Sequence, residues 1–295
     1  MIPANLSRRI PFRLLQRLAP QARARIGPQE LVIPLHDPAA LAWLYWQPSW
    51  KSEIIAHFLQ VRPGVLLDVG ANVGQTLADF LSVSPGQPYI GLEPNPRALA
   101  FVMEVAALNS LADVTLVPLG ASDRMQIQSL YLPAGDGTDS MATLRPDLRP
   151  GLGSHPAWIS TAPLDTVMDA LGAPALSLVK IDVEGAELEV LTGMRQCLTR
   201  STPAILCEVL LADRHADLTA YALRVGRLAD LLHTCDYAIY RLGLSAGGQF
   251  QSLQPVTAFP VAYWSHELNH ACDYLFVHRS TPANLLPVAS APPTA

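Results

Sequence analysis

Cysteine is scarce in this chain of 295 residues. The four cysteines, Cys197, Cys207, Cys235 and Cys272, are widely spaced, and none forms the Cys-x-x-Cys pattern typical of zinc and redox sites. Each lies in or beside an apolar stretch. We therefore expect buried free thiols in a reducing compartment, and a cytoplasmic protein.

Long hydrophobic runs are also missing. No apolar stretch approaches the roughly 20 residues that span a bilayer. The N-terminus has no apolar core of the kind that a signal peptide needs after its charges. Half of the residues are nevertheless hydrophobic, so the chain can bury a sizeable core as one large domain or two small ones.

Acidic residues are absent from the first 27 positions, which contain six arginines. The net charge of the chain is −5, so the remainder carries −11, and this acidic body argues against a nucleic-acid partner. The basic segment also contains apolar residues such as Ile10, Phe12 and Leu18. Two interpretations remain open: a helix lying on an anionic membrane surface, or a helix packed on the domain with its arginines in water.

Two neighbouring segments point to a nucleotide-like ligand. The stretch Val65–Gly74 is an apolar run that ends in an acid and a glycine-spaced turn, which predicts a buried strand, a tight loop and a helix start. Ligands bind at the carboxyl ends of such strands. The stretch Tyr89–Pro94 is a second strand ending in Glu93, which could accept both hydroxyls of a ribose.

The first loop does not have the G-x-G-x-x-G spacing that a dinucleotide needs, because Ala71 and Asn72 stand between Gly70 and Gly74. An acid at Asp68 would also sit poorly beside phosphate, but it suits a cationic ligand. S-adenosylmethionine fits, since it combines adenosine with a sulfonium and an ammonium group and carries no phosphate. The alternative is a loop pair with a purely structural role.

Apolar runs alternate with helical patterns along most of the chain. The strands expected from them are 65–69, 89–92, 114–119, 176–183, 204–209, 237–242 and 274–278, and the helices are 52–60, 74–83, 96–109, 164–171, 187–198 and 221–234. No convincing helical pattern separates the last two strands. A parallel crossover needs one, so this pair should be antiparallel.

The chain is therefore expected to be α/β, with the fold of class I methyltransferases: a Rossmann-like, mostly parallel seven-stranded sheet with an antiparallel last strand and helices on both faces. Residues 1–50 should form a basic, aromatic and irregular lead-in with short helices. Residues 51–281 should form the domain, and 282–295 a disordered tail. Within the domain, 124–162 should be an insert in which strands near 126–132 and 158–161 flank a long surface loop.

A second group of charges occupies the stretch Leu178–Glu187. Lys180 interrupts a buried strand, and Asp182 and Glu184 follow where it ends. Because the carboxyl ends of parallel strands share one edge, these acids should converge with Asp68 and Glu93. The alternative is that Glu184 and Glu187 only favour the first turn of the next helix.

At these motifs the sequence resembles the FkbM family of S-adenosylmethionine-dependent methyltransferases. The matching segments are Leu67–Gly74, Glu93–Pro96 including Asn95, Ala121–Asp123, Thr161–Asp165, Lys180–Glu187 and Glu208, which cover roughly residues 50 to 210. The resemblance implies S-adenosylmethionine as the cofactor and O-methylation as the activity, often on sugar hydroxyls in polysaccharide or natural-product pathways.

Site roles follow from the geometry together with this resemblance. Gly70, Ala71 and Gly74 should bring the loop close to the methionine half of the cofactor, while Asp68 and Asn72 hold its ammonium group, directly or through water. Glu93, with Asn95 beside it, should accept the ribose hydroxyls. Asp123 should accept from the adenine amino group, unless it only forms a local turn.

An alcohol acceptor needs a base that takes its proton. Asp182 is the first candidate, Glu184 and Glu208 follow, and His155 and His266 could reach over the pocket from irregular segments. The three acids could instead bind magnesium, but no adjacent acid pair supports this, and we expect no metal.

Two other classes of function stay open. A nicotinamide-dependent oxidoreductase would need a pyrophosphate loop and a Tyr-x-x-x-Lys motif, and the chain has neither. A module that binds adenosylmethionine without catalysis would keep the loop motifs but not depend on Asp182. We expect a small-molecule or glycan acceptor; neither the acceptor nor the oligomeric state can be named from these motifs.

Overall fold

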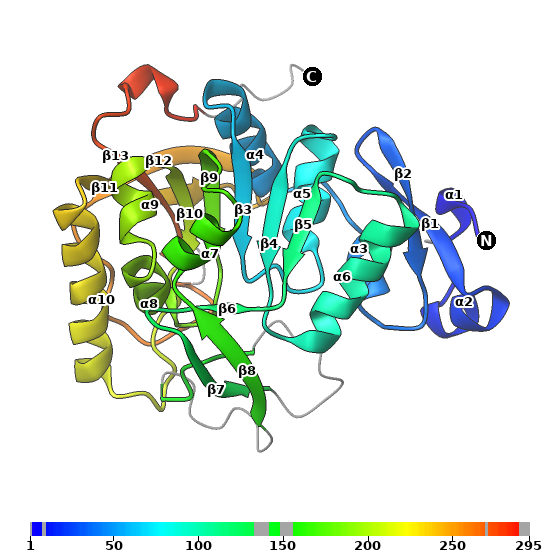
Figure 1. Cartoon of the computed structure of the whole chain (residues 1–295), viewed down its shortest axis with the longest axis horizontal. Coiled ribbons are helices and arrows are strands. Elements are labelled where there is room, and N and C mark those ends of the chain that lie inside the picture. The colour runs from blue at the N-terminus through cyan, green and yellow to red at the C-terminus, as the bar shows by residue number, and fades with distance from the viewer. Residues whose placement is uncertain (1, 8–9, 133–141, 148–155, 269–270, 289–295) are drawn as a thin grey trace.

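The computed structural model describes residues 2–7, 10–132, 142–147, 156–268 and 271–288. A large, mostly parallel sheet forms the centre, with helices on both faces (Figure 1). The two faces can be followed from β3: Leu66 packs in one hydrophobic cluster and Leu67 in the other. This alternation is what a strand buried on both sides requires. The α/β class with helices on both faces is therefore confirmed.

The sheet has eight strands in the order β12-β11-β13-β10-β9-β3-β4-β5. Five of them, β5, β4, β3, β9 and β10, are parallel, and β13 pairs antiparallel with both β10 and β11. Their bounds are β3 Val65–Val69, β4 Tyr89–Leu92, β5 Val114–Val117, β9 Leu176–Ile181, β10 Ala204–Glu208, β11 Tyr237–Leu244, β12 Phe250–Val256 and β13 Asp273–His278. The antiparallel pairing expected for the last two strands of the sequence analysis is confirmed.

The predicted number of strands was wrong by one. The extra strand, β12, lies at the edge of the sheet and pairs only with β11. Phe250 is its only buried residue, and Pro255 interrupts it. A strand that is exposed on both faces has neither an apolar run nor clean alternation, so β12 has no periodic pattern that would predict it.

Helices from two parts of the chain cover the two faces. The first face is covered by α4 Trp50–Val61, α5 Gln75–Val83 and α6 Pro96–Leu108, and the second by α7 Leu164–Ala170, α8 Glu187–Thr192, α9 Arg195–Arg200 and α10 Leu218–Thr234. Two expectations are corrected. The single helix predicted over 187–198 is broken at Gly193, where an added Cβ would lie 2.0 Å from the carbonyl oxygen of Ser122. The helix predicted over 52–60 begins earlier, at Trp50, because Ser49 is its N-cap and Ser52 completes the capping box.

The N-terminal segment is more regular than expected. Besides the short helices α1 Ala4–Ser7, α2 Phe12–Leu18 and α3 Ala40–Leu44, it forms an antiparallel hairpin of β1 Gln21–Ile26 and β2 Gln29–Pro34. In β1, alanines and an isoleucine are buried while the arginines between them are exposed. This period of two predicts a strand, but the strand was missed because the arginines were considered only for their charge.

The insert also forms strands. β7 Gln126–Tyr131 pairs antiparallel with β8 Pro156–Ala162, as expected, and β6 Gly120–Ala121 adds to β8 in parallel. Much of the predicted surface loop lies outside the described residues. In the predicted tail, a 3-10 turn forms at Ala283–Leu285, and the Leu285 carbonyl lies 2.9 Å from the ring nitrogen Nε2 of His57. Residues 289–295 are outside the described ranges. Within those ranges, no helix combines the length and apolarity needed to cross a membrane.

Candidate active site

A cavity of about 290 Å³ opens where β3, β4 and β9 end. Backbone and side chains of the loops after these strands line it, together with Lys51 from α4. Its polar lining residues are Lys51, Asn72, Gln75, Thr76, Glu93, Asn95, Lys180, Asp182 and Glu184. Its apolar lining residues include Leu92, Leu119, Leu130, Ala142, Leu144 and Val183. A cleft that combines apolar walls with convergent polar groups at the carboxyl edge of a parallel sheet is a typical cofactor site.

The loop after β3 is built around positions with positive φ. Gly70 has φ +83° and Asn72 has φ +46°. A Cβ on Gly70 would lie 1.9 Å from the carbonyl oxygen of Asp182, so only glycine lets this loop pass beside β9. Gly74, at φ +89°, leaves room for the ring of Trp43, which would lie 2.6 Å from an added Cβ. Gly70, Ala71 and Asn72 line the cavity as predicted, whereas Gly74 shapes the loop from behind.

Glu93 ends β4 and faces the cavity, although the residue is only 6% exposed. Its two carboxylate oxygens accept hydrogen bonds of 2.7 Å from the backbone N–H groups of Asn72 and Asn95. Burial raises the pKa of Glu93 to about 7, against the lowering effect of these two bonds. Each oxygen keeps a second lone pair, so the carboxylate can still accept from hydroxyl donors.

Asp68 does not line the cavity. It is fully buried beneath the loop, where Tyr89 donates a hydrogen bond of 2.5 Å to it and the Lys180 ammonium lies 3.2 Å away. Burial raises the pKa of Asp68, although Lys180 and Tyr89 oppose the effect. Contact with a cofactor ammonium was expected directly or through water; the direct form has no support in this geometry, because the Asp68 side chain does not reach the cavity. Asp68 instead holds Lys180, which donates a bond of 2.9 Å to the carbonyl oxygen of Gly70.

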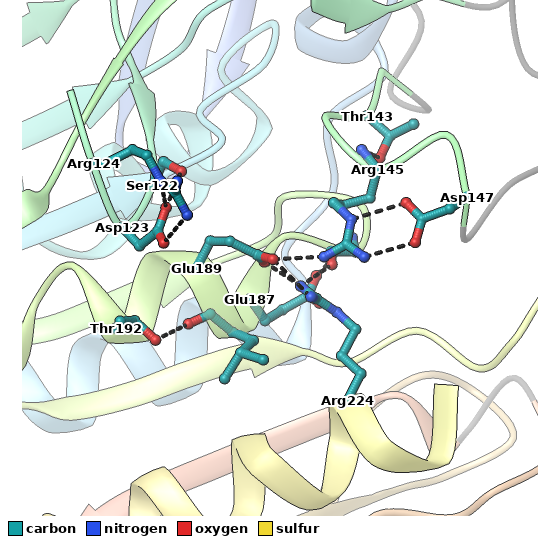
Figure 2. A network of polar contacts seen from close by, with 12 residues as sticks. Ser122, Asp123, Arg124, Thr143, Arg145, Asp147, Glu187, Glu189, Thr192 and Arg224 are labelled. Carbon is teal, nitrogen blue, oxygen red and sulfur yellow. Dashed lines mark hydrogen bonds and ion pairs between the residues drawn. The ribbon is translucent and has the colours of Figure 1, made fainter. Parts of the chain in front are cut away.

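Asp123 also lies away from the cavity lining. Its carboxylate accepts hydrogen bonds of 3.1 and 2.9 Å from the guanidinium of Arg124, and Ser122 lies 3.3 Å away (Figure 2). These contacts with Arg124 lower the pKa of Asp123. The structure thus favours the local role left open for Asp123 over a contact with adenine. The backbone just before it, at Gly120 and Ala121, does line the cavity.

The candidate bases are divided between the cavity wall and a row of acids beside it. Asp182 and Glu184 line the cavity. Ile181 of β9 and Cys207 of β10 are paired in the sheet, so the next residues along the two strands, Asp182 and Glu208, are neighbours. On its other side, Glu208 is paired with Asp273 of β13. Burial, then Asp182 and Asp273, raise the pKa of Glu208 to about 7.

Two residues of this region were missed by sequence reasoning. Asp273 begins β13, and an antiparallel partner of β10 must bring its first residue to the edge where β10 ends. The predicted antiparallel pairing could therefore have found it. Lys51 has no sequence signal, because it reaches the cavity from α4, the helix before β3, and not from the end of a strand. His155 lies outside the described residues, and His266 is exposed, with its ring 4.8 Å from that of Trp264.

The donor set of the cavity fits S-adenosylmethionine. Three carboxylates, Glu93, Asp182 and Glu184, face two lysines, and Lys180 is occupied by Asp68, Asp182 and a carbonyl oxygen. A ligand with phosphate groups would find little free positive charge here, while a cationic ligand with a ribose suits the site. Among the described residues, no three His, Cys, Asp or Glu side chains are grouped so that they could hold a metal ion.

Comparison with known proteins agrees with this fit. Residues 68–237 match the family described as Methyltransferase FkbM domain. The protein named 2-O-methyltransferase NoeI from Sinorhizobium fredii (strain NBRC 101917 / NGR234) is 27% identical over 157 residues, which are 50% of this chain and 64% of that protein. Cyclosporin synthetase simA of Tolypocladium inflatum is 38% identical over 88 residues, which are 27% of this chain and 1% of that protein.

A solved structure of Methyltransferase FkbM from Methylobacillus flagellatus KT aligns with a TM-score of 0.41 at 19% identity, covering 73% of this chain and 43% of that one. The chain thus spans less than two thirds of the length of these relatives. The family match itself extends over more than half of the chain, from the cofactor loop to the start of β11. The chain belongs to the FkbM family of S-adenosylmethionine-dependent methyltransferases.

Proposed function

We propose that the chain transfers a methyl group from S-adenosylmethionine to a hydroxyl group of a glycan or a small hydroxylated metabolite. The observation that supports this most is the position of Asp182. Its carboxylate lies in the cavity wall, 26% exposed, and its backbone packs directly on the cofactor loop at Gly70. The printed name of the relative NoeI, a 2-O-methyltransferase, supports oxygen as the accepting atom.

When bound, S-adenosylmethionine supplies an electrophilic methyl group on a sulfonium. In the transfer, an oxygen–carbon bond forms, the carbon–sulfur bond breaks with its electron pair left on sulfur, and the hydroxyl proton must leave. Asp182 accepts that proton. The ammonium of Lys180, 3.4 Å from Asp182, orients the carboxylate. Burial would discharge this lysine, but Asp182 and Asp68 outweigh burial and raise the pKa of Lys180, so it stays protonated.

Cofactor binding is the work of the loops at the end of β3 and β4. Glu93 accepts from the ribose hydroxyls, and the loop Gly70–Asn72 together with Glu184 lies where the cationic half is held. Apolar residues such as Leu92 and Leu119 exclude water, which otherwise competes with the acceptor for the methyl group. Family membership removes the basis for the nicotinamide-dependent alternative.

The first test is a calorimetric titration with S-adenosylmethionine, its demethylated product and NAD, followed by methyl-label transfer to a panel of glycans and hydroxylated metabolites. We expect binding of the first two compounds and label on a hydroxyl oxygen. Binding of NAD alone, or label found only on nitrogen or carbon, would contradict the proposal.

Substitution of the base separates an enzyme from a binding module. Asp182→Asn should lower kcat by about 10²- to 10⁴-fold, while the Kd of the cofactor stays within a few-fold. Asp230→Asn, an exposed acid on α10, is the matched control and should change neither quantity. Unchanged turnover in Asp182→Asn would show that another group takes the proton, with Glu208 next to be tested.

A further inference from the structure

One wall of the cofactor cavity comes from a segment that is remote from the sheet in sequence. Ala142 and Leu144 line the cavity, and the residues around them, Ala142–Asp147, are here named the strap. Thr143 anchors its first half. The backbone of Thr143 exchanges two hydrogen bonds with that of Tyr131 in β7, at 2.9 and 3.0 Å, and its hydroxyl donates to the carbonyl oxygen of Glu184 at 2.6 Å.

Arg145 anchors the second half of the strap through charge (Figure 2). Its guanidinium donates 2.6 Å hydrogen bonds to Asp147 in the strap and to Glu189 on α8. Glu189 also accepts from Arg224 on α10, at 2.7 Å for one pair of atoms and at a shorter contact for the other. Arg224 in turn donates to the carbonyl oxygen of Gly185, 2.6 Å away.

These four side chains form a line of alternating charge: Asp147, Arg145, Glu189 and Arg224. Burial increases along it, from 57% side-chain exposure at Asp147 to 23% at Glu189 and 11% at Arg224. Burial opposes ionisation of Glu189, but Arg224 and Arg145 together outweigh it and lower its pKa. Because a partly buried carboxylate between two guanidinium groups is weakly screened, this contact should hold more firmly than a surface ion pair.

Glu189 is the element of this line that joins the strap to the body of the domain. If Glu189 lost its charge, the guanidinium groups of Arg145 and Arg224 would repel each other without the carboxylate that now binds both. Of the hydrogen bonds and ion pairs described between the strap and the rest of the domain, those of Thr143 would then remain. We infer that Glu189 positions the strap against the cavity, and that opening the Arg145–Glu189 contact is required for the cofactor and its demethylated product to leave.

The inference rests on the proposed cofactor site, and the test has one readout that needs no ligand. In Glu189→Gln, the backbone amides of Thr143 and Arg145, both hydrogen-bonded inside the strap region, should exchange with deuterium at least about tenfold faster in the ligand-free protein. Amides of the β3–β9 ladder should keep their exchange rates. The demethylated cofactor product should dissociate about tenfold faster or more, with kcat changed less than KM for the cofactor.

Asp147→Asn is the matched control, because it removes a carboxylate from the same arginine at the exposed end of the line. It should change either rate by less than about threefold. Arg145→Lys keeps the charge but loses the paired geometry, and it should give an intermediate effect.

Two results would overturn the inference. Unchanged exchange in Glu189→Gln would show that Glu189 does not hold the strap. Faster exchange with unchanged product dissociation would show that the strap is not the barrier to release. If the wild-type protein bound neither S-adenosylmethionine nor its demethylated product, the cofactor assignment would be wrong, and so would the role of the strap in retaining the cofactor. The exchange rates of the ligand-free protein would still show whether Glu189 holds the strap, so the two failures can be distinguished.

Discussion

Glu93 shows how one carboxylate can be both structural and functional. It accepts hydrogen bonds from two backbone N–H groups, and these bonds fix the shape of the loops after β3 and β4. The carboxylate still faces the cavity. Its pKa, raised by burial to about 7, means that its charge changes near neutral pH. An ionised carboxylate accepts hydroxyl hydrogen bonds better than a neutral acid does.

The affinity for the cofactor should therefore depend on pH through Glu93. Affinity should rise as pH increases through about 7 and Glu93 ionises. Protein stability should move in the opposite direction: between pH 4.5 and about 7 the folded state binds more protons at Glu93 than the unfolded state, so stability falls as pH rises. Glu93→Gln should weaken cofactor binding by about 10- to 100-fold and flatten its pH dependence. Calorimetry across this range measures both, and an unchanged pH profile in Glu93→Gln would remove Glu93 from this role.

Lys180 is the second residue with a sharp expected outcome. It is 5% exposed, and it lies between the fully buried Asp68 and the cavity residue Asp182. Lys180→Met leaves Asp68 buried without its counter-charge, which should cost about 3–5 kcal/mol of unfolding free energy. Burial already raises the pKa of Asp68, so the loss should shrink as pH falls and the carboxyl takes up a proton.

Urea unfolding at several pH values measures this loss. The double variant Lys180→Met, Asp68→Asn removes both charges and should recover part of the stability. A double variant that is less stable than Lys180→Met alone would contradict the pairing.

The sequence predicted the place of a site residue correctly where that place depends only on the end of a strand. Glu93, Asp182 and Glu184 reach the cavity because parallel strands end at one edge. Asp68 does not line the cavity, because it lies within β3, which is buried on both faces, and not beyond the end of the strand. Asp123 does not line the cavity either, and its ion pair with the neighbouring Arg124 is a contact that no strand pattern reveals.

At the scale of elements, α2 presents a surface that the domain does not cover. Leu15 is fully buried, but Leu14 is 46% and Leu18 is 60% exposed. Arg13 and Arg17 are exposed beside them, and within the described residues neither forms an ion pair. The burial of Leu15 agrees with the interpretation of a helix packed on the domain, and the outward face of this helix is basic and apolar. Contact with a membrane stays a prediction.

Vesicle co-sedimentation tests that contact. The protein should bind vesicles rich in anionic lipid and not neutral ones, with affinity falling as salt increases, because each arginine near the surface contributes about 1 kcal/mol. The double variant Leu14→Glu, Leu18→Glu should lose this binding. Leu223→Glu, on the exposed side of α10, is the matched control. Equal binding to neutral and anionic vesicles, or none to either, would contradict the prediction.

Elements buried on both faces were the easiest to predict. Strands β3 and β9 are buried at every position, and each is an apolar run that is interrupted by Asp68 in β3 and by Ser177 and Lys180 in β9. Among the elements that are exposed on one or both faces, β7 and β8 were predicted, whereas β12 and the β1–β2 hairpin were missed. The break between α8 and α9 depends on a tertiary contact at Gly193, and no local pattern contains it.

At the scale of the whole molecule, the N-terminal segment shares its core with the sheet. Trp43 is fully buried in the same hydrophobic cluster as Leu66 and Leu77, and its indole donates a 2.7 Å hydrogen bond to the carbonyl oxygen of Val73. Nearby, Asp79 on α5 accepts from Trp46, Ser49 and Ser52. The segment is thereby tied to the helix that follows the cofactor loop.

Truncation of Trp43 should therefore destabilise the fold as a core substitution does. Trp43→Ala should lower the free energy of unfolding by about 3–5 kcal/mol, and it should weaken cofactor binding because its ring supports the turn at Gly74. Trp158→Ala, at a position that is 73% exposed, should stay within about 0.5 kcal/mol of the wild type. Denaturant unfolding measures both changes in the free energy of unfolding. Equal changes for the two substitutions would show that the core does not need the N-terminal segment.

The edge strand β12 also affects how copies of this chain can associate. An outermost strand normally offers a row of unsatisfied backbone donors and acceptors, onto which a second polypeptide can be added. In β12, Pro255 deletes one donor, and glutamines point outward on either side of Leu253. This border of the sheet is consequently a poor template for open-ended polymerisation, even when the protein is crowded.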